Sequence, residues 1–325
     1  MYEGNPYRTR HTDDLCLVGA FLDDRLVGVH GWLPLVVNHH GTPRTGCHFC
    51  NWLAAPDMRR GSWPIRLTTD PIRAIGADAC FGFAFTPQSR PILQRLGWTI
   101  DAALPRHTRI LDAGAFAGLF AGQPAVVEAT AGWASGPCPA EGGDVVERAS
   151  LRDVDWDDVY WSQLAPASWG PARERAWLVW RYEEVPGFAY RFLTLMRDGA
   201  PAGLLVFRVE LVSGTPFTVI RIVDILAGPE DWEPLLARCV AIGVAAGAAL
   251  ADFFCASTRV GAVLAKAGFV AGSAGQPDPV PFLFRPLDPT PQAQEFGWQF
   301  TGADPAVCGG DLYLTKADGD FDRPN

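Results

Sequence analysis

The sequence predicts a mixed α/β chain of two similar units, each with a mostly antiparallel sheet flanked by helices. Three observations support this prediction. Strand-like runs joined by tight turns open each half, and an apolar helix ending in a basic residue, one further residue and glycine follows in each. The length of 325 residues suits two domains, and 48% apolar with 19% charged residues provides a core and argues against a disordered chain.

The opening hairpin of the first half is repeated in the second. Strand-like runs at 15–22 and 26–33 match runs at 192–196 and 202–209, and each pair surrounds a turn that contains aspartate. A glycine follows the turn in both copies. This order is typical of antiparallel strands joined by a tight turn.

A later match indicates a strand, helix and strand in each half. Residues 92–98 and 263–269 both read as an apolar helix with a basic last turn, a glycine C-cap and an aromatic residue that starts a strand. The offset between the matches drifts slowly, as expected for two copies with loop insertions. Because the intervening stretch is rich in Gly, Pro, Ala and Ser, the sequence predicts a first domain of residues 1–131, a linker of 132–144, a second domain of 145–285 and an extension of 286–325.

Composition excludes several classes of protein. With a net charge of -9 and no basic stripe, the chain is not expected to bind nucleic acid. The longest uncharged apolar runs, 113–127 and 239–251, are shorter than the roughly 18 residues of a membrane span. The opening residues lack the pattern of an export signal, so the eight cysteines are expected to be reduced thiols in the cytoplasm.

The segment 49–65 carries the clearest chemistry. A strand ends near Ala55, a short basic loop follows, and a helix begins near Ser62, with Ser62 as N-cap and Pro64 in the first turn. Such a loop points backbone N–H groups toward an anion, and the helix N-terminus adds positive potential. The loop therefore suits a pyrophosphate; the alternative is an ordinary strand-to-helix turn with two solvated arginines.

This segment resembles the coenzyme A pyrophosphate loop of the GNAT superfamily of acyltransferases, and residues 82–98 resemble the strand and helix that follow it there. The order of motifs is most similar to tandem GNAT proteins found with bacterial polysaccharide and amino-sugar biosynthesis, and residues 180–182 and 318–325 strengthen that likeness. The resemblance implies an N-acetyltransferase that uses acetyl-CoA and acts on an amine of a nucleotide-linked sugar. The coenzyme contacts that it implies are Leu53, Ala54, Ala55, Arg59, Arg60, Gly61, Ser62, Trp63, Pro64, Thr86 and Ser89.

Some positions depart from the family pattern. Met58 stands at the usual Arg or Gln of the loop, Trp63 at its second small residue, and Leu93 where many members have a general-acid tyrosine. The corresponding loop of the second half, 227–231, is acidic and would repel a pyrophosphate. The first copy also begins at the middle of the family's fold. Either the second half supplies the missing elements or the first site is incomplete.

Acyl transfer to an amine requires a base, an oxyanion donor and a proton for the leaving thiolate. The resemblance implies that the strand before the loop splays from its neighbour and that an N–H near 53–55 holds the thioester carbonyl. His48 and Asn51 are the polar candidates on this strand, but their spacing places them on opposite faces unless a bulge intervenes. A third candidate, Asp224, stands alone in the apolar strand 219–226. A structural role is the alternative for His48 and Asp224.

Other readings remain open at this point. Cys47 and Cys50 form a CxxC pair with no second pair at zinc spacing, so packing in a strand is expected and no metal is predicted. The chain is either an acetyltransferase with its acceptor cleft between the halves or a degenerate, non-catalytic GNAT-like binding protein. An aminoacyl-tRNA-dependent transferase is a third reading, which the acidic balance disfavours. A homodimer is compatible with the sequence.

Overall fold

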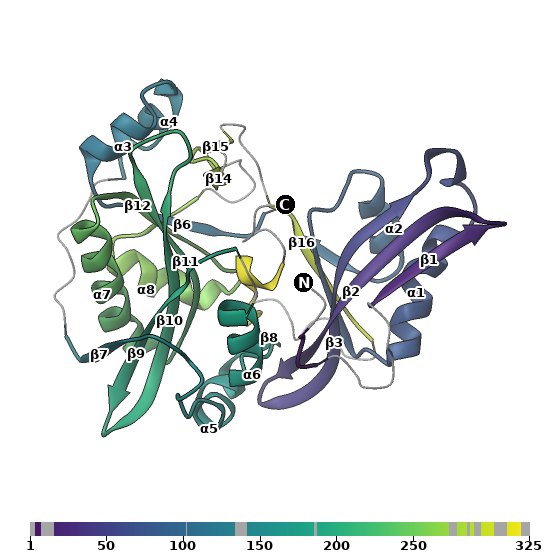
Figure 1. Ribbon diagram of the computed structural model, residues 1–325, viewed down its shortest axis with the longest axis horizontal. Coiled ribbons are helices and arrows are strands. Elements are labelled where there is room, and N and C mark those ends of the chain that lie inside the picture. The colour runs from purple at the N-terminus through teal and green to yellow at the C-terminus, as the bar shows by residue number, and fades with distance from the viewer. Residues whose placement is uncertain are drawn as a thin grey trace.

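Two mixed sheets of seven strands each, flanked by helices, form the frame of the molecule (Figure 1) and confirm the expected fold class. The computed structural model describes residues 4–7, 16–101, 103–133, 142–184, 187–272, 278–284, 287–288, 294–301 and 311–319. None of the helices in these ranges is both long and apolar enough to cross a membrane.

The first sheet is antiparallel except for one parallel pair, β3 with β4. Its order is β1 (Leu17–Leu22), β2 (Arg25–His39), β3 (Thr42–Ala54), β4 (Ala79–Phe83), β16 (Phe296–Phe300) and β5 (Thr99–Asp101), and β8 (Trp169–Pro171) also pairs with β2. Helices α1 (Trp63–Ile75) and α2 (Ser89–Arg95) pack on one face of this sheet, where Ile72 and Leu93 share a core with Cys47 and Cys80.

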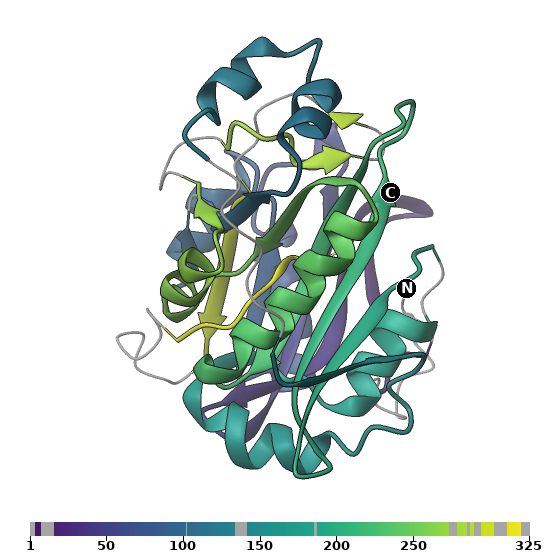
Figure 2. The ribbon, with the colours of Figure 1, turned by 90° about the vertical axis from the view of Figure 1, so that its left-hand side faces the viewer.

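The second sheet repeats this plan, again with one parallel pair, β11 with β12. Its order is β13 (Val270–Ala271), β6 (Arg106–Ile110), β12 (Ala248–Phe254), β11 (Thr218–Ala227), β10 (Ala200–Leu211), β9 (Arg191–Arg197) and β7 (Asp144–Arg148). Helix α7 (Trp232–Ala245) lies across one face, as Figure 2 shows. The remaining elements are α3 (Ala113–Leu119), α4 (Pro124–Ala129), α5 (Asp157–Val159), α6 (Arg175–Val179), α8 (Gly261–Lys266) and the pair β14 (Leu283–Phe284) and β15 (Leu287–Asp288).

The two sheets exchange strands across the boundary that the sequence predicts at 132–144. Strand β6, from the expected first domain, pairs with β12 in the second sheet, whereas β16, from the expected extension, lies between β4 and β5 of the first (Figure 1). Residues of α3 and α4 also pack with the second sheet, since Phe116 and Val126 share a core with Val219 and Leu250.

A large apolar cluster joins the two halves. It lies on the face of the first sheet opposite α1 and α2, and Trp169 is its most central ring, in contact with Phe81, Trp298 and Phe300. The cluster includes Leu35, Val37 and Phe81 from the first sheet, and Phe254, Phe282, Leu312 and Leu314 from the second half and the extension. Segments from later in the chain thus cover the face that the short first half leaves open.

Candidate active site

Strands β3 and β4 diverge before either ends. They pair in parallel from Gly46 to His48 and from Ala79 to Phe81, and beyond these pairs β3 continues to Ala54 paired with β2 but not with β4. The parallel direction brings the loop after β3 and the turn after β4 to the same edge of the sheet. Backbone pairing between the two strands therefore ends beside the basic loop, and this unpaired stretch is called the gap between β3 and β4.

The edge of β3 that faces this gap carries a backbone donor. The N–H of Ala55 donates to the carbonyl of Val27 on β2, at 2.8 Å. Because successive N–H groups of a strand point to opposite edges, the N–H of Ala54 points toward the gap. The side chain of Arg59 donates to the carbonyl of Ala54 at 3.2 Å, and Leu53 is 64% exposed beside it.

A bulge interrupts β3 at Asn51. The pairing with β2 shifts by one residue between the pairs Val29–Leu53 and Gly31–Cys50, and Asn51 has a φ of 55°, which asparagine tolerates better than most residues. Their spacing in the sequence allows the side chains of His48 and Asn51 to reach one pocket only if the strand contains such a bulge.

The two candidates on β3 differ in exposure. His48 is buried, and its ring lies 5.5 Å from that of Phe83, whereas Asn51 is exposed. The bulge separates them, so strict alternation of sides does not apply to this pair. His48 is thus held in the structure close to the point where β3 and β4 part, and Asn51 lies further along at the surface.

The loop after β3 is short and exposed. A single turn of 3-10 helix, Pro56–Met58, is followed by Arg59, Arg60 and Gly61, and Gly61 has a φ of 88°, a left-handed conformation that favours glycine. Helix α1 then begins with Pro64 in its first turn. Ser62 is the N-cap residue as predicted, but its side chain makes no capping hydrogen bond. The loop is tied to the β1–β2 hairpin by an ion pair of Asp57 with Arg25, at 2.5 Å.

Trp63 packs between the loop and the sheet. Its indole N–H donates to the carbonyl of Met58 at 3.0 Å, and its ring covers Gly28 on β2, where an added Cβ would lie 2.6 Å from it. Gly28 is therefore needed to admit the ring. The large side chain at this departure from the family pattern also borders Gly61, where an added Cβ would lie 3.9 Å from its Cδ1.

Thr86 and Ser89 form a reciprocal turn where α2 begins. The N–H of Ser89 donates to the hydroxyl of Thr86 at 3.1 Å, and the N–H of Thr86 donates to that of Ser89 at 2.9 Å. Thr86 is exposed and Ser89 half-buried, at the same edge of the sheet as the basic loop. Leu93 is buried in the core beneath α2.

The thiol of Cys47 pairs with a cysteine other than Cys50. The thiol of Cys47 lies 3.5 Å from that of Cys80 on β4, and burial raises the pKa of the Cys47 thiol. Cys50 is partly exposed. This arrangement favours packing in the strand pair over redox chemistry, because a buried, protonated thiol is a weak nucleophile.

The second half has a matching gap, but the chain itself fills it. Strands β11 and β12 pair as far as Ile222 and Phe253 and then diverge. The segment 311–315 enters between them: the N–H of Ile225 on β11 donates to the hydroxyl of Tyr313 at 3.0 Å, and Thr315 bridges to Cys255 after β12. The loop after β11 holds Glu230 and Asp231, as the sequence shows.

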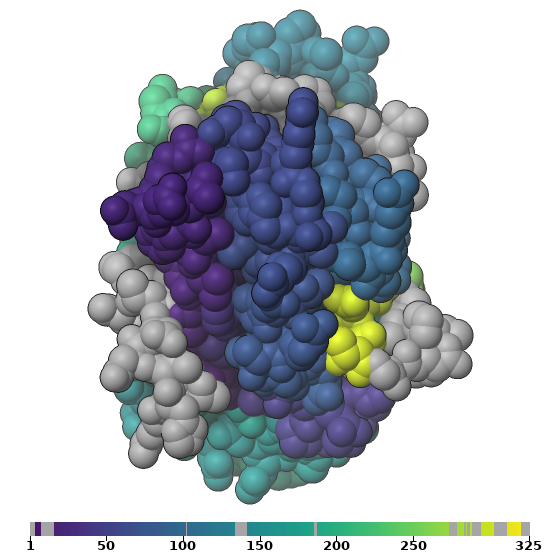
Figure 3. Space-filling model, turned by 90° about the vertical axis from the view of Figure 1, so that its right-hand side faces the viewer, coloured from purple at the N-terminus to yellow at the C-terminus, as the bar shows by residue number. Residues whose placement is uncertain are grey.

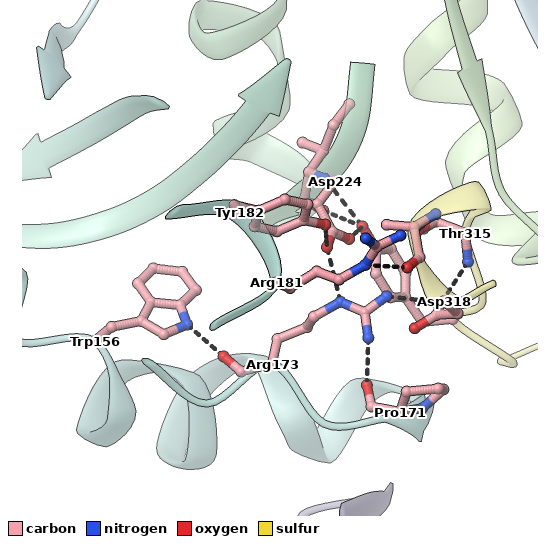
Figure 4. Close-up of polar contacts among 11 residues, drawn as sticks. Trp156, Pro171, Arg173, Arg181, Tyr182, Asp224, Thr315 and Asp318 are labelled. Carbon is pink, nitrogen blue, oxygen red and sulfur yellow. Dashed lines mark hydrogen bonds and ion pairs between the residues drawn. The ribbon is translucent and has the colours of Figure 1, made fainter. Parts of the chain in front are cut away.

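Asp224 lies on β11, in the other sheet from His48 and Asn51, and Figure 4 shows its polar contacts. Its carboxylate accepts from Arg173 at 2.8 Å, from Tyr182 at 2.6 Å and from Tyr313 at 3.0 Å. Burial alone would lower the pKa of Arg173, but Asp224 and Asp318 hold it above the ordinary value. The structure does not bring Asp224 to the gap between β3 and β4, and its surroundings favour a structural role.

Sequence reasoning missed the partners of Asp224. Arg173 also binds Asp318 at 2.8 Å, and Arg181 donates to the carbonyls of Ala317 and Gly319 (Figure 4). A buried aspartate in an apolar strand needs a buried cation as its partner. Asp224 itself was therefore the sequence signal that a buried arginine should be sought.

No model of a protein family matches the chain, and no curated protein sequence matches it. Its structure is similar to three solved structures, with 11–14% sequence identity and TM-scores of 0.53–0.56. They are a conserved protein of unknown function and probable N-acyltransferase from Enterococcus faecalis V583, and GCN5-related N-acetyltransferases from Anabaena variabilis ATCC 29413 and Kribbella flavida. The similarities cover 86%, 88% and 91% of this chain but only 61%, 63% and 62% of those chains. The chain therefore has the fold of the GCN5-related N-acetyltransferases, and it spans about three fifths of the length of these relatives.

Proposed function

We propose that the chain transfers an acetyl group from acetyl-CoA to an amine, and that the first half binds the coenzyme. The observation that carries this proposal is the contrast between the two gaps. The gap between β3 and β4 lies beside a basic loop with Gly61, whereas the gap between β11 and β12 is filled by Tyr313 and adjoins an acidic loop.

In this proposal the loop binds the pyrophosphate of the coenzyme, and the edge of β3 binds its pantetheine arm. Backbone N–H groups around Gly61, with Arg59, Arg60 and the N-terminus of α1, bind the pyrophosphate. Leu53, Ala54 and Ala55 line the gap for the pantetheine arm, and the N–H of Ala54 stabilises the oxyanion that forms when the amine attacks the thioester. The remaining contacts that we propose come from Ser62, Trp63, Pro64, Thr86 and Ser89.

We propose His48 as the base that removes the proton from the acceptor ammonium, through water, with Asn51 at the mouth of the site. His48 lies where the strands part, and a neutral imidazole accepts a proton near pH 7. Asp224, the other candidate base, anchors Arg173 instead in this proposal.

The acceptor that we propose is an amine on a nucleotide-linked sugar, bound between the halves. Support for the sugar comes from the likeness to tandem GNAT proteins, and the net charge of -9 suits a cationic amine better than tRNA. A cytoplasmic location is part of the proposal and depends on the eight cysteines being kept reduced.

The test has two stages. Calorimetry with acetyl-CoA measures binding, and chromatographic detection of released coenzyme A measures turnover with nucleotide-linked amino sugars and, in parallel, with simple amines. Binding and turnover with an amino sugar are expected. Failure to bind acetyl-CoA contradicts the coenzyme site and favours the non-catalytic binding protein; binding with turnover only on simple amines contradicts the sugar acceptor alone.

A further inference from the structure

The first sheet is one strand short of the second at a corresponding edge. By the sequence repeat, the hairpin β1–β2 corresponds to β9–β10. In the second sheet, β7 pairs along the outer edge of β9, from Asp144–Met196 to Arg148–Phe192. Within the ranges that the structure describes, β1 pairs with β2 on one edge and ends the sheet on the other.

A groove lies on the α1 side of the first sheet, and β1 forms part of its wall. In the second half, α7 contacts β7 as well as β9 and closes that flank. In the first half, a groove of about 1100 Å³ lies between α1 and the strands β1, β2 and β3. Its walls are mainly apolar and include Val18, Ala20, Trp32, Trp63, Leu67 and Pro71.

The edge strand itself carries no charge. From Leu17 to Leu22 every residue is apolar or glycine, and four side chains of the hairpin are unusually exposed for their type: Leu17 at 42%, Phe21 at 65%, Leu22 at 50% and Leu26 at 51%. Free edge strands in natural proteins are protected by charges, proline or bulges. The bulge between Ala20 and Phe21 is the one such feature of β1, and it lies near the end of the strand.

The backbone of β1 is also oriented for pairing. The carbonyl of Cys16 accepts the N–H of Trp32, so the hydrogen-bonding groups of Cys16, and by alternation those of Val18, point toward β2. Those of Leu17 and Gly19 point outward. Figure 1 places β1 at the rim of the molecule, on the side away from the second sheet, and Figure 3 shows it at one margin of the face that bears α1 and α2.

We propose that two copies of this chain associate along β1, which pairs antiparallel with β1 of the second copy across a two-fold axis. A strand that pairs with itself must be compatible with its own charge, and β1 has none, so no like charges meet where the two strands pair. The pairing adds the missing edge strand, extends the first sheet into a continuous one and leaves the gap between β3 and β4 open.

The test is the mass of the full chain in solution, measured by light scattering after gel filtration and by sedimentation velocity. The expected mass is twice 35.2 kDa. Leu17→Lys and Phe21→Lys are each expected to yield a folded monomer, because both side chains are exposed in the single chain. Leu211→Lys is the matched control, since Leu211 is 58% exposed on β10 of the other sheet and its change should leave the dimer intact.

A second measurement separates this interface from any other. Hydrogen–deuterium exchange of the wild-type chain should show protection of the Leu17 and Gly19 amides at dimeric concentrations and loss of protection on dilution. A monomeric wild-type chain, a dimer that both lysine variants leave intact, or fast exchange of these two amides in the dimer overturns the proposal. None of these results depends on coenzyme binding.

Discussion

Arg173 and Asp224 form an ion pair with Nε 2.8 Å from Oδ2, and neither side chain is exposed to solvent. The ion pair joins the segment between β8 and α6 to strand β11. Asp318, in the last described range of the chain, also pairs with Arg173, at 2.8 Å. The segment that fills the gap between β11 and β12 is thus fixed by charge as well as by packing.

We expect Asp224→Ala to destabilise the fold rather than to slow catalysis directly. Loss of one partner leaves Arg173 with Asp318 alone, and breaking a buried pair typically costs about 3–5 kcal/mol. Urea unfolding measures the loss. Asp198→Asn is the control, because Asp198 lies exposed in the turn between β9 and β10. Wild-type stability of Asp224→Ala together with a large fall in turnover would instead support Asp224 as the base.

Gly61→Val is expected to abolish measurable binding of acetyl-CoA. The φ of 88° at Gly61 disfavours a β-branched residue, so the loop must change shape where its N–H groups bind the pyrophosphate. Isothermal calorimetry measures the affinity, and the thermal melt should change little because the loop is exposed. Gly122→Val is the matched control, since an added side chain there meets nothing within 4 Å. Equal affinities in Gly61→Val and the wild type would contradict the site.

His48→Ala is expected to lower kcat by roughly 10²–10⁴-fold, as loss of a general base does, while affinity for acetyl-CoA is kept. The acidic limb of the pH–rate profile should disappear with it. His40→Asn serves as the control because His40 lies in the turn between β2 and β3, where asparagine tolerates the φ of 49°. A profile that keeps its acidic limb in His48→Ala would assign the base elsewhere.

Much of the candidate coenzyme site can be predicted from the sequence, because short local patterns specify its strand, loop and helices. The strand, loop and helix of 49–65 follow from Pro56, Gly61 and Pro64, and the later helix from its glycine C-cap at Gly97. Long-range pairing gave no such signal: the place of β16 between β4 and β5 depends on contacts such as those of Trp298 with Trp169. The ion pair of Asp318 with Arg173 is likewise a long-range contact that no local pattern indicates.

Stability is expected to fall as the pH is lowered from about 6.5, the pKa of an unfolded histidine. Burial lowers the pKa of His30 to about 4 despite its hydrogen bond with the carbonyl of Leu67, and burial also lowers the pKa of His107 to about 4. Between these values the unfolded chain binds protons that the folded chain does not. Each histidine therefore removes about 1.4 kcal/mol per pH unit over this range.

Urea unfolding between pH 7 and pH 5 measures this slope, in a range where most carboxylates stay charged. His30→Leu should reduce the slope by the share of one histidine. A slope that is the same in His30→Leu and the wild type would show that His30 is not buried in its neutral form.

Separate expression of residues 1–131 and 145–325 is expected to fail for each fragment alone and to succeed for the two together. The first fragment lacks β16 and β8, and the second lacks β6, so each sheet loses strands from its interior or face. The cluster around Trp169 would also be split, leaving apolar surface open on both fragments. With an affinity tag on one fragment only, co-purification of the other after co-expression measures assembly. If the first fragment alone is soluble and binds acetyl-CoA as tightly as the full chain does, the strand exchange is dispensable and the coenzyme site belongs to an independent module.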